Sequence, residues 1–483
     1  MTTNIKPTVA LIKASLPTYF PDEFGVFDNA EAELGRLEDS LGFSLHVESE
    51  IPMDGRQTIA CLDRCRAAGA DFVLLLHGGF TMGDVARAVA ASGMRAGFWA
   101  TPEPVREGDV KLNNYVSLNM SLSIARRVRD LGEAPVQWYF GAPGSSLFFD
   151  RFSATVSALQ AIKMLEGARI GVVGGLAQTF YNMEVSTNAL HERLGVDVVY
   201  HDMDEFTSRL DGLDDNRVSA ECSAMLQAAR ADGVTDDHMM MSACMALALH
   251  DMATDGDYKA LAVSDWPRLQ EYPGLHPGAA FTWAEEKYDL PIASEGDVLG
   301  SVSQLVGLSL AGRPGYLLDT TDPDTEDGSL LMWHGGGGPL YLADENGARW
   351  INHPMLGRSD PEGARFGAIS DLVFRDGPIT AFRVGENAGA LFTMQARVEE
   401  RTPTGFTGCR GWVRDFDIAG EPASILDVVQ TTMTHGLEHH FILVPGHHSA
   451  ALIEFASWTG QRLLKRVPYT PYLAAEPFEQ NEH

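Results

Sequence analysis

The sequence predicts an α/β protein in which two doubly wound parallel-sheet domains are followed by a β-rich domain that is antiparallel or barrel-like. Strand and helix signals alternate along residues 1–163 and again along residues 164–318, the order that builds parallel sheets covered by helices. Along residues 319–483 apolar residues recur at every second position, as in antiparallel sheets. A chain of 483 residues is too long for one hydrophobic core, so we expect these three ranges to be separate domains.

The first range contains five short apolar segments that are typical of buried strands. They lie at residues 8–12, 43–47, 71–76, 95–99 and 136–140. A helical segment, FDNAEAELGRLEDSLG, separates the first two. The loops after these strands, the first of which begins at Lys13, would line the carboxyl edge of the sheet, where α/β proteins bind their ligands.

The second range begins near Met164 and contains a strand at residues 169–173 that runs into a glycine turn. Its letters, GVVGGL, match the dinucleotide-binding pattern G-x-G-x-x-G poorly, so we assign no dinucleotide site. Further strands are expected at residues 196–200, 260–264 and 290–293. This range therefore repeats the alternation of the first.

The third range is built from period-two segments. Residues 366–374 and 378–384, joined by the turn Arg375-Asp376-Gly377, predict a β-hairpin. Similar segments follow at residues 391–398 and 411–416, and the range closes with the strand FILVP and a helix at residues 449–459.

The composition excludes several classes of partner. A formal net charge of −30 argues against nucleic acids and anionic membranes, since both require clustered Lys and Arg. No stretch approaches the roughly 20 apolar residues that cross a bilayer, so we expect no membrane span. The N-terminus lacks the pattern of a signal peptide, and we expect a cytoplasmic protein. The five cysteines show no zinc-site spacing, and we assign neither disulfides nor a thiolate metal site.

Two carboxylates each follow a short apolar segment. Glu295 comes directly after the segment 290–293, and Asp319 comes directly after Tyr316-Leu317-Leu318. If both segments are parallel strands, the two acids lie at one edge of a sheet, where they could bind a divalent metal or move protons between carbons. The alternative is that such acids cap helices or face solvent.

A histidine cluster lies near the C-terminus, on both sides of the FILVP strand. It consists of Glu438-His439-His440 before the strand and His447-His448 after it. If the acids and one histidine converge, they form an O,O,N ligand set that suits a divalent ion such as Mn²⁺. Such an ion polarises a carbonyl while a carboxylate removes the adjacent proton, which is aldose–ketose isomerisation through an enediol.

Four motifs in this order resemble the L-fucose isomerase and L-arabinose isomerase superfamily. They are EGD at 295–297, Asp319 at 24 residues after Glu295, MWHGGGGP at 332–339, and EHHFILVPGHHSAALIEFAS at 438–457. Many relatives have a cysteine where this chain has Gly335.

The resemblance implies a Mn²⁺-dependent sugar isomerase with two α/β domains and a β-rich domain. It implies that Glu295 and Asp319 bind the metal and transfer protons, and that His440 is the third ligand. It also implies that His439 touches substrate or metal and that His334 is a further site histidine. Members usually form trimers or hexamers in which the N-terminal domain of a neighbour closes the pocket, so we expect a homo-oligomer.

The sequence therefore predicts a Mn²⁺-dependent aldose–ketose isomerase of a free monosaccharide. One alternative is an anionic sugar such as a sulfonated hexose, for which Lys13 or a nearby arginine would face the far end of the sugar. Others are a non-catalytic sugar-binding or regulatory protein and a metal-dependent aldolase or hydrolase. Trp333 could stack on the sugar or serve only for packing. The sequence leaves open which sugar binds, which acid takes the first proton, and what His447 and His448 do.

Overall fold

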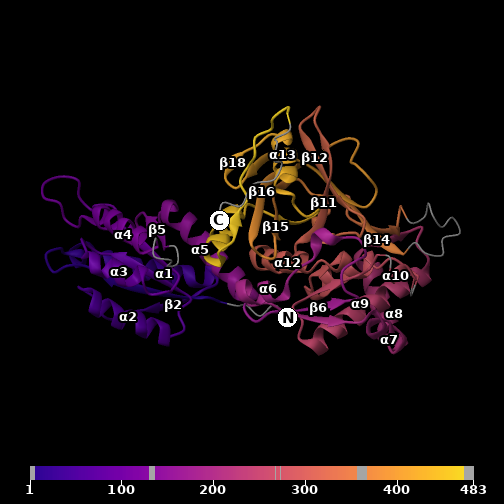
Figure 1. The fold of residues 1–483 in the computed structure, drawn as a ribbon, viewed down its shortest axis with the longest axis horizontal. Coiled ribbons are helices and arrows are strands. Elements are labelled where there is room, and N and C mark those ends of the chain that lie inside the picture. Colours follow the sequence, from indigo (N-terminus) through magenta and orange to yellow (C-terminus); the bar gives the residue numbers. More distant parts are fainter. Residues whose placement is uncertain (1–5, 130–135, 267, 272–273, 356–366, 473–483) are drawn as a thin grey trace. The chain divides into compact units, whose positions relative to one another are not determined.

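A computed structural model describes residues 6–129, 136–266, 268–271, 274–355 and 367–472 of the chain. The chain forms two compact units, Thr3–Lys163 and Met164–His483. Figure 1 shows the helices and strands of each. The two units are described separately below.

The first unit contains a five-stranded parallel sheet with the strand order β2-β1-β3-β4-β5. This is the order of the flavodoxin-like doubly wound sheets. The strands are β1 Thr8–Ala14, β2 Ser44–Val47, β3 Phe72–His77, β4 Ala96–Ala100 and β5 Val136–Phe140. The helices are α1 Val26–Leu41, α2 Gly55–Ala67, α3 Gly83–Ala90, α4 Asn114–Arg129 and α5 Ser146–Leu165, with a 3₁₀ turn η1 at Pro21–Phe24.

The central strands of this sheet are buried along their whole length. Every residue of β3, FVLLLH, is buried, as expected for a parallel strand covered by helices on both faces. The predicted parallel α/β sheet is confirmed here. Lys13, however, lies within β1 and not in a loop after it, and its ammonium group pairs with the carboxylate of Glu31.

The second unit contains a four-stranded parallel sheet with the order β10-β9-β6-β7. Its strands are β6 Arg169–Val173, β7 Asp197–His201, β9 Ala260–Val263 and β10 Ile292–Ala293. The helices in this part of the chain are α6 Thr187–Leu194, α7 Met203–Asp211, α8 Asp215–Ala228, α9 Asp236–Gly256, α10 Arg268–Glu271, α11 Gly278–Tyr288 and α12 Val298–Ala311. The 3₁₀ turns η2 Tyr181–Met183 and η3 Ser294–Gly296 follow β6 and β10.

The second unit also contains an eleven-stranded mixed sheet, in which β16 pairs with β17 in addition to β15. Its strands are β8 Arg230–Asp232, β11 Tyr316–Asp324, β12 Ser329–His334, β13 Arg349–Asn352, β14 Ala368–Val373, β15 Gly377–Gly385, β16 Ala390–Glu399, β17 Cys409–Ile418, β18 Glu421–Pro422, β19 His440–Pro445 and β20 Arg462–Leu463. The remaining elements are η4 Leu340–Leu342, α13 Ile425–His435 and α14 Ser449–Thr459. Strand β8 belongs to the second predicted range but pairs with β13 of the third, so this sheet crosses the predicted boundary at residue 318. The division into three domains stays a prediction.

Helix α12 lies between the two sheets of this unit. It packs on β9 and β10 of the parallel sheet and on β15 and β19 of the mixed sheet. Its sequence, VLGSVSQLVGLSLA, is apolar on all sides, as expected for a helix with no face to solvent. Two of its serines bridge the layers, since Ser301 donates to the Leu261 carbonyl and Ser303 accepts from the Val384 N–H.

Two predicted pairings are wrong. Strands β14 and β15 do not form the expected hairpin, because β14 pairs with β13 and β17 while β15 pairs with β16 and β19. The strand that carries Asp319 is antiparallel to both neighbours, β12 and β19, and continues to Asp324. Asp319 therefore does not lie at the end of a parallel strand.

None of the helices in the described ranges combines the length and the apolar character that crossing a membrane requires.

Candidate functional site

Glu295 follows β10, at the carboxyl edge of the parallel sheet of the second unit. Its backbone is left-handed, with φ 61° and ψ 12°, which costs a non-glycine residue free energy. Two hydrogen bonds hold this conformation. The Glu295 N–H donates to Asp265 Oδ1 at 2.6 Å, and the Glu295 carbonyl accepts from the Ala177 N–H at 2.9 Å. Asp265 follows β9 and is buried, and burial raises its pKa to about 7.

Gly296 lets the loop after β6 approach this turn closely. Its φ is 72°, and a Cβ at this position would lie 2.2 Å from the Gly175 carbonyl oxygen. The ends of β6, β9 and β10 thus converge on the Glu295 turn, as the sheet-edge argument predicts for this acid.

His440, the first residue of β19, is fully buried, and its two ring nitrogens have different surroundings. Nδ1 lies 3.0 Å from Asp297 Oδ2, whereas Nε2 has no hydrogen-bond partner among the described residues and lies 3.5 Å from Glu295 Oε2. Because a carboxylate only accepts, Nδ1 is the donor to Asp297, and in the neutral form of the ring Nε2 carries the lone pair on the side of Glu295.

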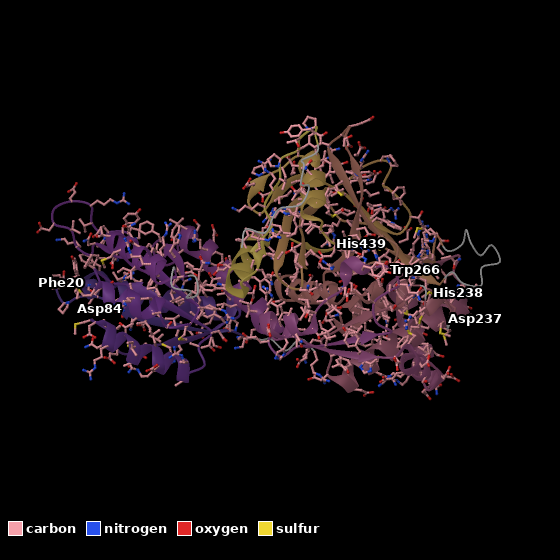
Figure 2. All side chains as sticks on the ribbon, viewed as in Figure 1. Phe20, Asp84, Asp237, His238, Trp266 and His439 are labelled. Atoms are coloured by element: carbon pink, nitrogen blue, oxygen red, sulfur yellow. The ribbon has the colours of Figure 1, made fainter. Side chains whose placement is uncertain are left out.

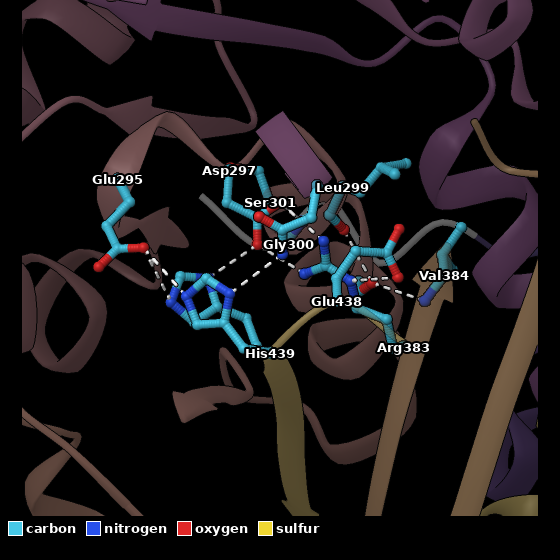
Figure 3. A network of polar contacts seen from close by, with 12 residues as sticks. Glu295, Asp297, Leu299, Gly300, Ser301, Arg383, Val384, Glu438 and His439 are labelled. Carbon is cyan, nitrogen blue, oxygen red and sulfur yellow. Dashed lines mark hydrogen bonds and ion pairs between the residues drawn. The ribbon is translucent and has the colours of Figure 1, made fainter. Parts of the chain in front are cut away.

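Asp297 is held ionised by Arg383, which is as deeply buried. Asp297 Oδ2 accepts from Arg383 Nη1 at 2.5 Å, and Oδ1 accepts from Nη2 at 3.0 Å and from the Gly300 N–H at 2.8 Å. Burial alone would raise the pKa of Asp297, but the Arg383 guanidinium and the His440 ring hold it below its usual range. One carboxylate therefore caps α12, neutralises a buried arginine and orients His440. Figure 3 shows Asp297 between Arg383 and the imidazole rings.

His439 has the opposite role to its neighbour. Its Nε2 lies 3.2 Å from Glu295 Oε2 and is the donor there, since Glu295 is a carboxylate. Burial lowers the pKa of His439, but the bond to Glu295 and the charge of Asp319 outweigh this and raise it. Phe180 stacks on the ring at 5.4 Å between centroids. Two adjacent histidines thus face one carboxylate, one as a donor and one with a lone pair.

Asp319 lies directly opposite His440 in the pairing of β11 with β19, and directly opposite Trp333 in the pairing of β11 with β12. Side chains of directly opposite residues share one face of the sheet. Asp319 Oδ1 is buried and has no hydrogen-bond partner among the described residues. Burial raises the pKa of this carboxyl, against the opposing effect of the two histidines. The Trp333 indole donates to the Thr407 carbonyl at 2.8 Å.

His334, at the end of β12, is buried with its ring 5.4 Å from that of His440. Its Nδ1 accepts from the Gly336 N–H at 3.0 Å. Burial, with smaller effects of the neighbouring histidines, lowers its pKa well below the usual value. The ring is therefore neutral with its proton on Nε2, which makes His334 a hydrogen-bond donor and not a metal ligand.

The residues fit a divalent metal. Ligand atoms of Glu295, His439 and His440 lie within 4.8 Å of one another. Two buried atoms near them lack partners, His440 Nε2 and Asp319 Oδ1. A nitrogen lone pair and carboxylate oxygens are ligands that Mn²⁺ accepts, and the Asp297–His440 contact is the usual outer support of a metal-binding histidine. Asp319 does not join the 4.8 Å group in the described part of the chain, so its place as a ligand stays a prediction.

A second group of possible ligands, His46, Glu48 and Cys65, lies in the first unit. Its chemistry suits a metal less well. Glu48 already accepts from Arg64 Nε at 2.9 Å, and burial raises the pKa of the Cys65 thiol to about 12, which disfavours a thiolate.

Three further residues have predicted or open roles. Lys13 belongs to the first unit, so its contact with a sugar stays a prediction. His448 precedes α14 and donates through Nε2 to the Pro445 carbonyl at 2.9 Å, and His447 is exposed.

Asp297, Arg383 and Asp265 belong to the site although no role for them was predicted from the sequence. Two signals were present. Asp297 stands three residues before Gly300 at the start of an apolar helix, the position of an N-cap, and Arg383 is a charged residue inside the apolar segment ITAFRVG. No local pattern marks Asp265 as the partner of the Glu295 backbone.

Comparison with known proteins finds no family model that matches the chain. Among curated proteins, the chain is 24% identical over 349 residues to the sulfoquinovose isomerase of Alkalicoccus urumqiensis, covering 72% of this chain and 74% of that one. It is 25% identical over 361 residues to the sulfoquinovose isomerase of Priestia megaterium, covering 74% and 76%. It is 24% identical over 368 residues to that of Clostridium sp. strain MSTE9, covering 74% and 77%.

Among solved structures, a solute-binding protein of an ABC transporter from Actinobacillus succinogenes, with bound D-allose, aligns with 55% of this chain and 82% of its own. The sequence identity is 13% and the TM-score is 0.17, which is too low to establish a common fold.

Proposed function

We propose that the chain is a divalent-metal-dependent aldose–ketose isomerase that acts on a sulfonated hexose. Its similarity to several sulfoquinovose isomerases indicates an aldose–ketose isomerase. The same relatives favour the anionic, sulfonated substrate over the neutral monosaccharide that the sequence analysis placed first. The metal we propose is Mn²⁺, because the available ligands are one imidazole nitrogen and carboxylate oxygens.

One observation carries the metal-dependent chemistry. His440 Nε2 is fully buried, has no hydrogen-bond partner in the part of the chain that the structure describes, and lies 3.5 Å from a carboxylate oxygen of Glu295, while the contact with Asp297 directs its lone pair that way. A buried nitrogen without a partner is costly in a protein that binds nothing there. Glu295, Asp319 and His440 would hold the ion, and a bound ion would polarise the carbonyl of an open-chain sugar.

The chain's own groups supply the proton transfers. Isomerisation requires a base that takes a proton from one carbon and an acid that returns it to the next. The Glu295 carboxylate accepts a hydrogen bond from the His439 Nε2–H, and burial raises the pKa of Asp319 above the usual value of an aspartate. His334 Nε2–H and the Trp333 indole ring would contact the sugar, with His334 donating to one of its oxygens. A non-catalytic binding protein has no need of two such carboxyl groups.

The test is conversion of sulfoquinovose by EDTA-stripped protein before and after addition of Mn²⁺, followed by NMR in D₂O. The proposal predicts that the ketose forms only with metal and that solvent deuterium enters the carbon that accepts the proton. Glu295→Gln, with its fold checked by circular dichroism, should abolish conversion. The proposal fails if folded, Mn²⁺-loaded protein converts none of the sugar, or if conversion is independent of both metal and Glu295.

The oligomeric state is part of the proposal. A trimer or hexamer, with a neighbouring subunit completing the pocket, would be observed by light scattering, and it would bring a residue such as Lys13 of a second copy within reach of the sugar.

A further inference from the structure

A sulfonated sugar is an anion, so its binding site needs a positively charged side chain. The net negative charge of the chain disfavours the binding of such a substrate. The formal net charge is −30, with 66 acidic and 36 basic residues, so the average field of the protein repels an anion. A sulfonate keeps its charge at every physiological pH and offers three acceptor oxygens. The side chain that matches it best is an arginine, whose guanidinium donates in a fixed fork.

Among the residues that the structure describes, none pairs with the guanidinium of Arg268, which distinguishes it from many arginines of the second unit. Several other arginines of the unit have carboxylate partners, as in Arg217 with Asp251, Arg401 with Asp324 and Arg414 with Asp327. Arg268 is exposed, and no hydrogen bond or ion pair joins it to a residue in the described ranges. Its charge is therefore available to a ligand.

The position of Arg268 is tied to the Glu295 turn through the loop after β6. A Cβ on Gly174 would lie 3.6 Å from Arg268 Nη1, so the guanidinium lies beside this loop. The next residues of the same loop contact the Glu295 turn. A Cβ on Gly296 would lie 2.2 Å from the Gly175 oxygen, and the Ala177 N–H donates to the Glu295 carbonyl. A Cβ on Gly175 would meet nothing within 4 Å, so the loop surface between the two groups is open.

The segment after β9 also connects Arg268 with the Glu295 turn. Arg268 begins α10, three residues after Asp265, whose carboxylate holds the Glu295 N–H. Between them Trp266, which is half exposed, packs edge-on against Phe180 at 6.3 Å between centroids, and Phe180 stacks on His439. Figure 2 labels His439 and Trp266 on this part of the molecule. The segment after β9 thus presents an aromatic ring, Trp266, and an exposed cation, Arg268, beside the carboxylate–histidine cluster.

We infer that Arg268 binds the sulfonate group of the substrate. This inference rests on the proposed function, since it names the residue that recognises the charged end of the sugar. The carbons that exchange the proton lie at one end of the open-chain hexose, beside Glu295, and the sulfonate lies at the other end. The charge of the sulfonate does not change during the isomerisation. Arg268 therefore contributes to substrate affinity and to discrimination against neutral hexoses.

The experiment compares Arg268→Gln, Arg268→Lys and wild type as Mn²⁺-loaded proteins, with sulfoquinovose and with the uncharged hexose that has a hydroxyl in place of the sulfonate. Arg193→Gln is the matched control, because Arg193 is also exposed and has no partner in the described ranges. Arg268→Gln should lower kcat/KM for the sulfonated sugar by about tenfold to 100-fold, mainly through KM, as expected for a hydrogen bond between charged groups. Arg268→Lys should retain part of the activity.

The inference is overturned if Arg268→Gln changes kcat/KM for the sulfonated sugar no more than Arg193→Gln does, or if it lowers kcat/KM for both sugars by the same factor. Calorimetric binding of sulfoquinovose to each protein tests Arg268 independently of turnover. Wild type that binds the sugar without converting it contradicts the proposed function, and the loss of binding in Arg268→Gln then still decides the role of Arg268. Wild type that neither binds nor converts the sugar overturns both.

Discussion

Replacing Asp297 by asparagine tests which ring nitrogen of His440 carries the proton. The substitution changes only one carboxylate oxygen, which becomes an NH₂ group. An asparagine must place its NH₂ group at one of the two carboxylate positions. At the Oδ1 position it would face two donors, the Gly300 N–H and Arg383 Nη2. At the Oδ2 position it would face one donor, Arg383 Nη1, and could donate to His440 Nδ1. The second orientation is favoured, and it moves the His440 proton to Nε2.

The expected effect is a loss of metal affinity. A His440 ring with its proton on Nε2 has no lone pair to offer beside Glu295, and changes to the partner of a metal-binding histidine usually cost about 10–100-fold in affinity. This corresponds to about 1.4–2.7 kcal/mol. The variant should also be less stable, by up to about 3–5 kcal/mol, because the buried Arg383 loses the charge of Asp297 and keeps Glu438 as an anionic neighbour at 3.8 Å.

The assay is Mn²⁺ binding to EDTA-stripped protein, followed by electron paramagnetic resonance of the free ion. Asp371→Asn is the matched control, because Asp371 is also buried and accepts from Arg349 at 2.8 Å and from Arg410. The control should lose stability but keep its Mn²⁺ affinity. Wild-type affinity in Asp297→Asn, at a temperature where the variant is folded, would refute the assignment of His440 Nε2 as a ligand.

Three further predictions concern Glu295, the buried Glu285 of α11, and the effect of Mn²⁺ on stability. Glu295→Gln should lower turnover by at least about 10²-fold, the lower range for a lost general base, and near-normal turnover would remove Glu295 from the mechanism. Burial raises the pKa of Glu285 from 4.5 to about 8. Between these pH values the folded state retains a proton that the unfolded state loses, so the stability of the wild type should fall as the pH rises from about 4.5 to 8. In Glu285→Gln this fall should be reduced, as measured by thermal unfolding, and parallel pH profiles of the two proteins would contradict it. Addition of Mn²⁺ to stripped protein should raise the unfolding temperature of wild type more than that of His440→Ala, and equal shifts would place the ion elsewhere.

The acids at the site illustrate how far sequence patterns reach. Glu295 lies at the carboxyl edge of a parallel sheet, as its apolar strand predicts. Asp319 approaches the cluster for a different reason, because it is paired with His440 in an antiparallel ladder. An apolar run of three residues does not reveal whether its neighbours will be parallel, and one of the two partner strands, β19, lies more than 100 residues away in the chain.

The incorrect hairpin has the same physical origin. Arg375-Asp376-Gly377 is a good turn sequence, and the strands on both sides exist. The turn nevertheless joins strands that do not pair with each other, since β14 pairs with β13 and β17 while β15 pairs with β16 and β19. Local turn chemistry predicts a change of direction, and long-range side-chain packing decides which strands pair.

Buried charge is the signal that could have extended the site. Arg383 lies in an apolar strand, and a buried arginine requires an anionic partner. The acid of the EGD motif that follows Glu295 was a candidate for this partner, and it also fixes His440. The contact between Asp265 and the Glu295 backbone depends on two loops that meet only in the folded sheet, so no sequence pattern predicts it.

Anomalous diffraction at the manganese edge, from crystals of Mn²⁺-loaded protein, tests the central claim most directly. The account predicts one strong peak in contact with the Glu295 carboxylate and His440 Nε2, with Asp319 turned toward it. A peak bound by other residues, such as His46, Glu48 and Cys65, or no peak beside Glu295, would contradict it.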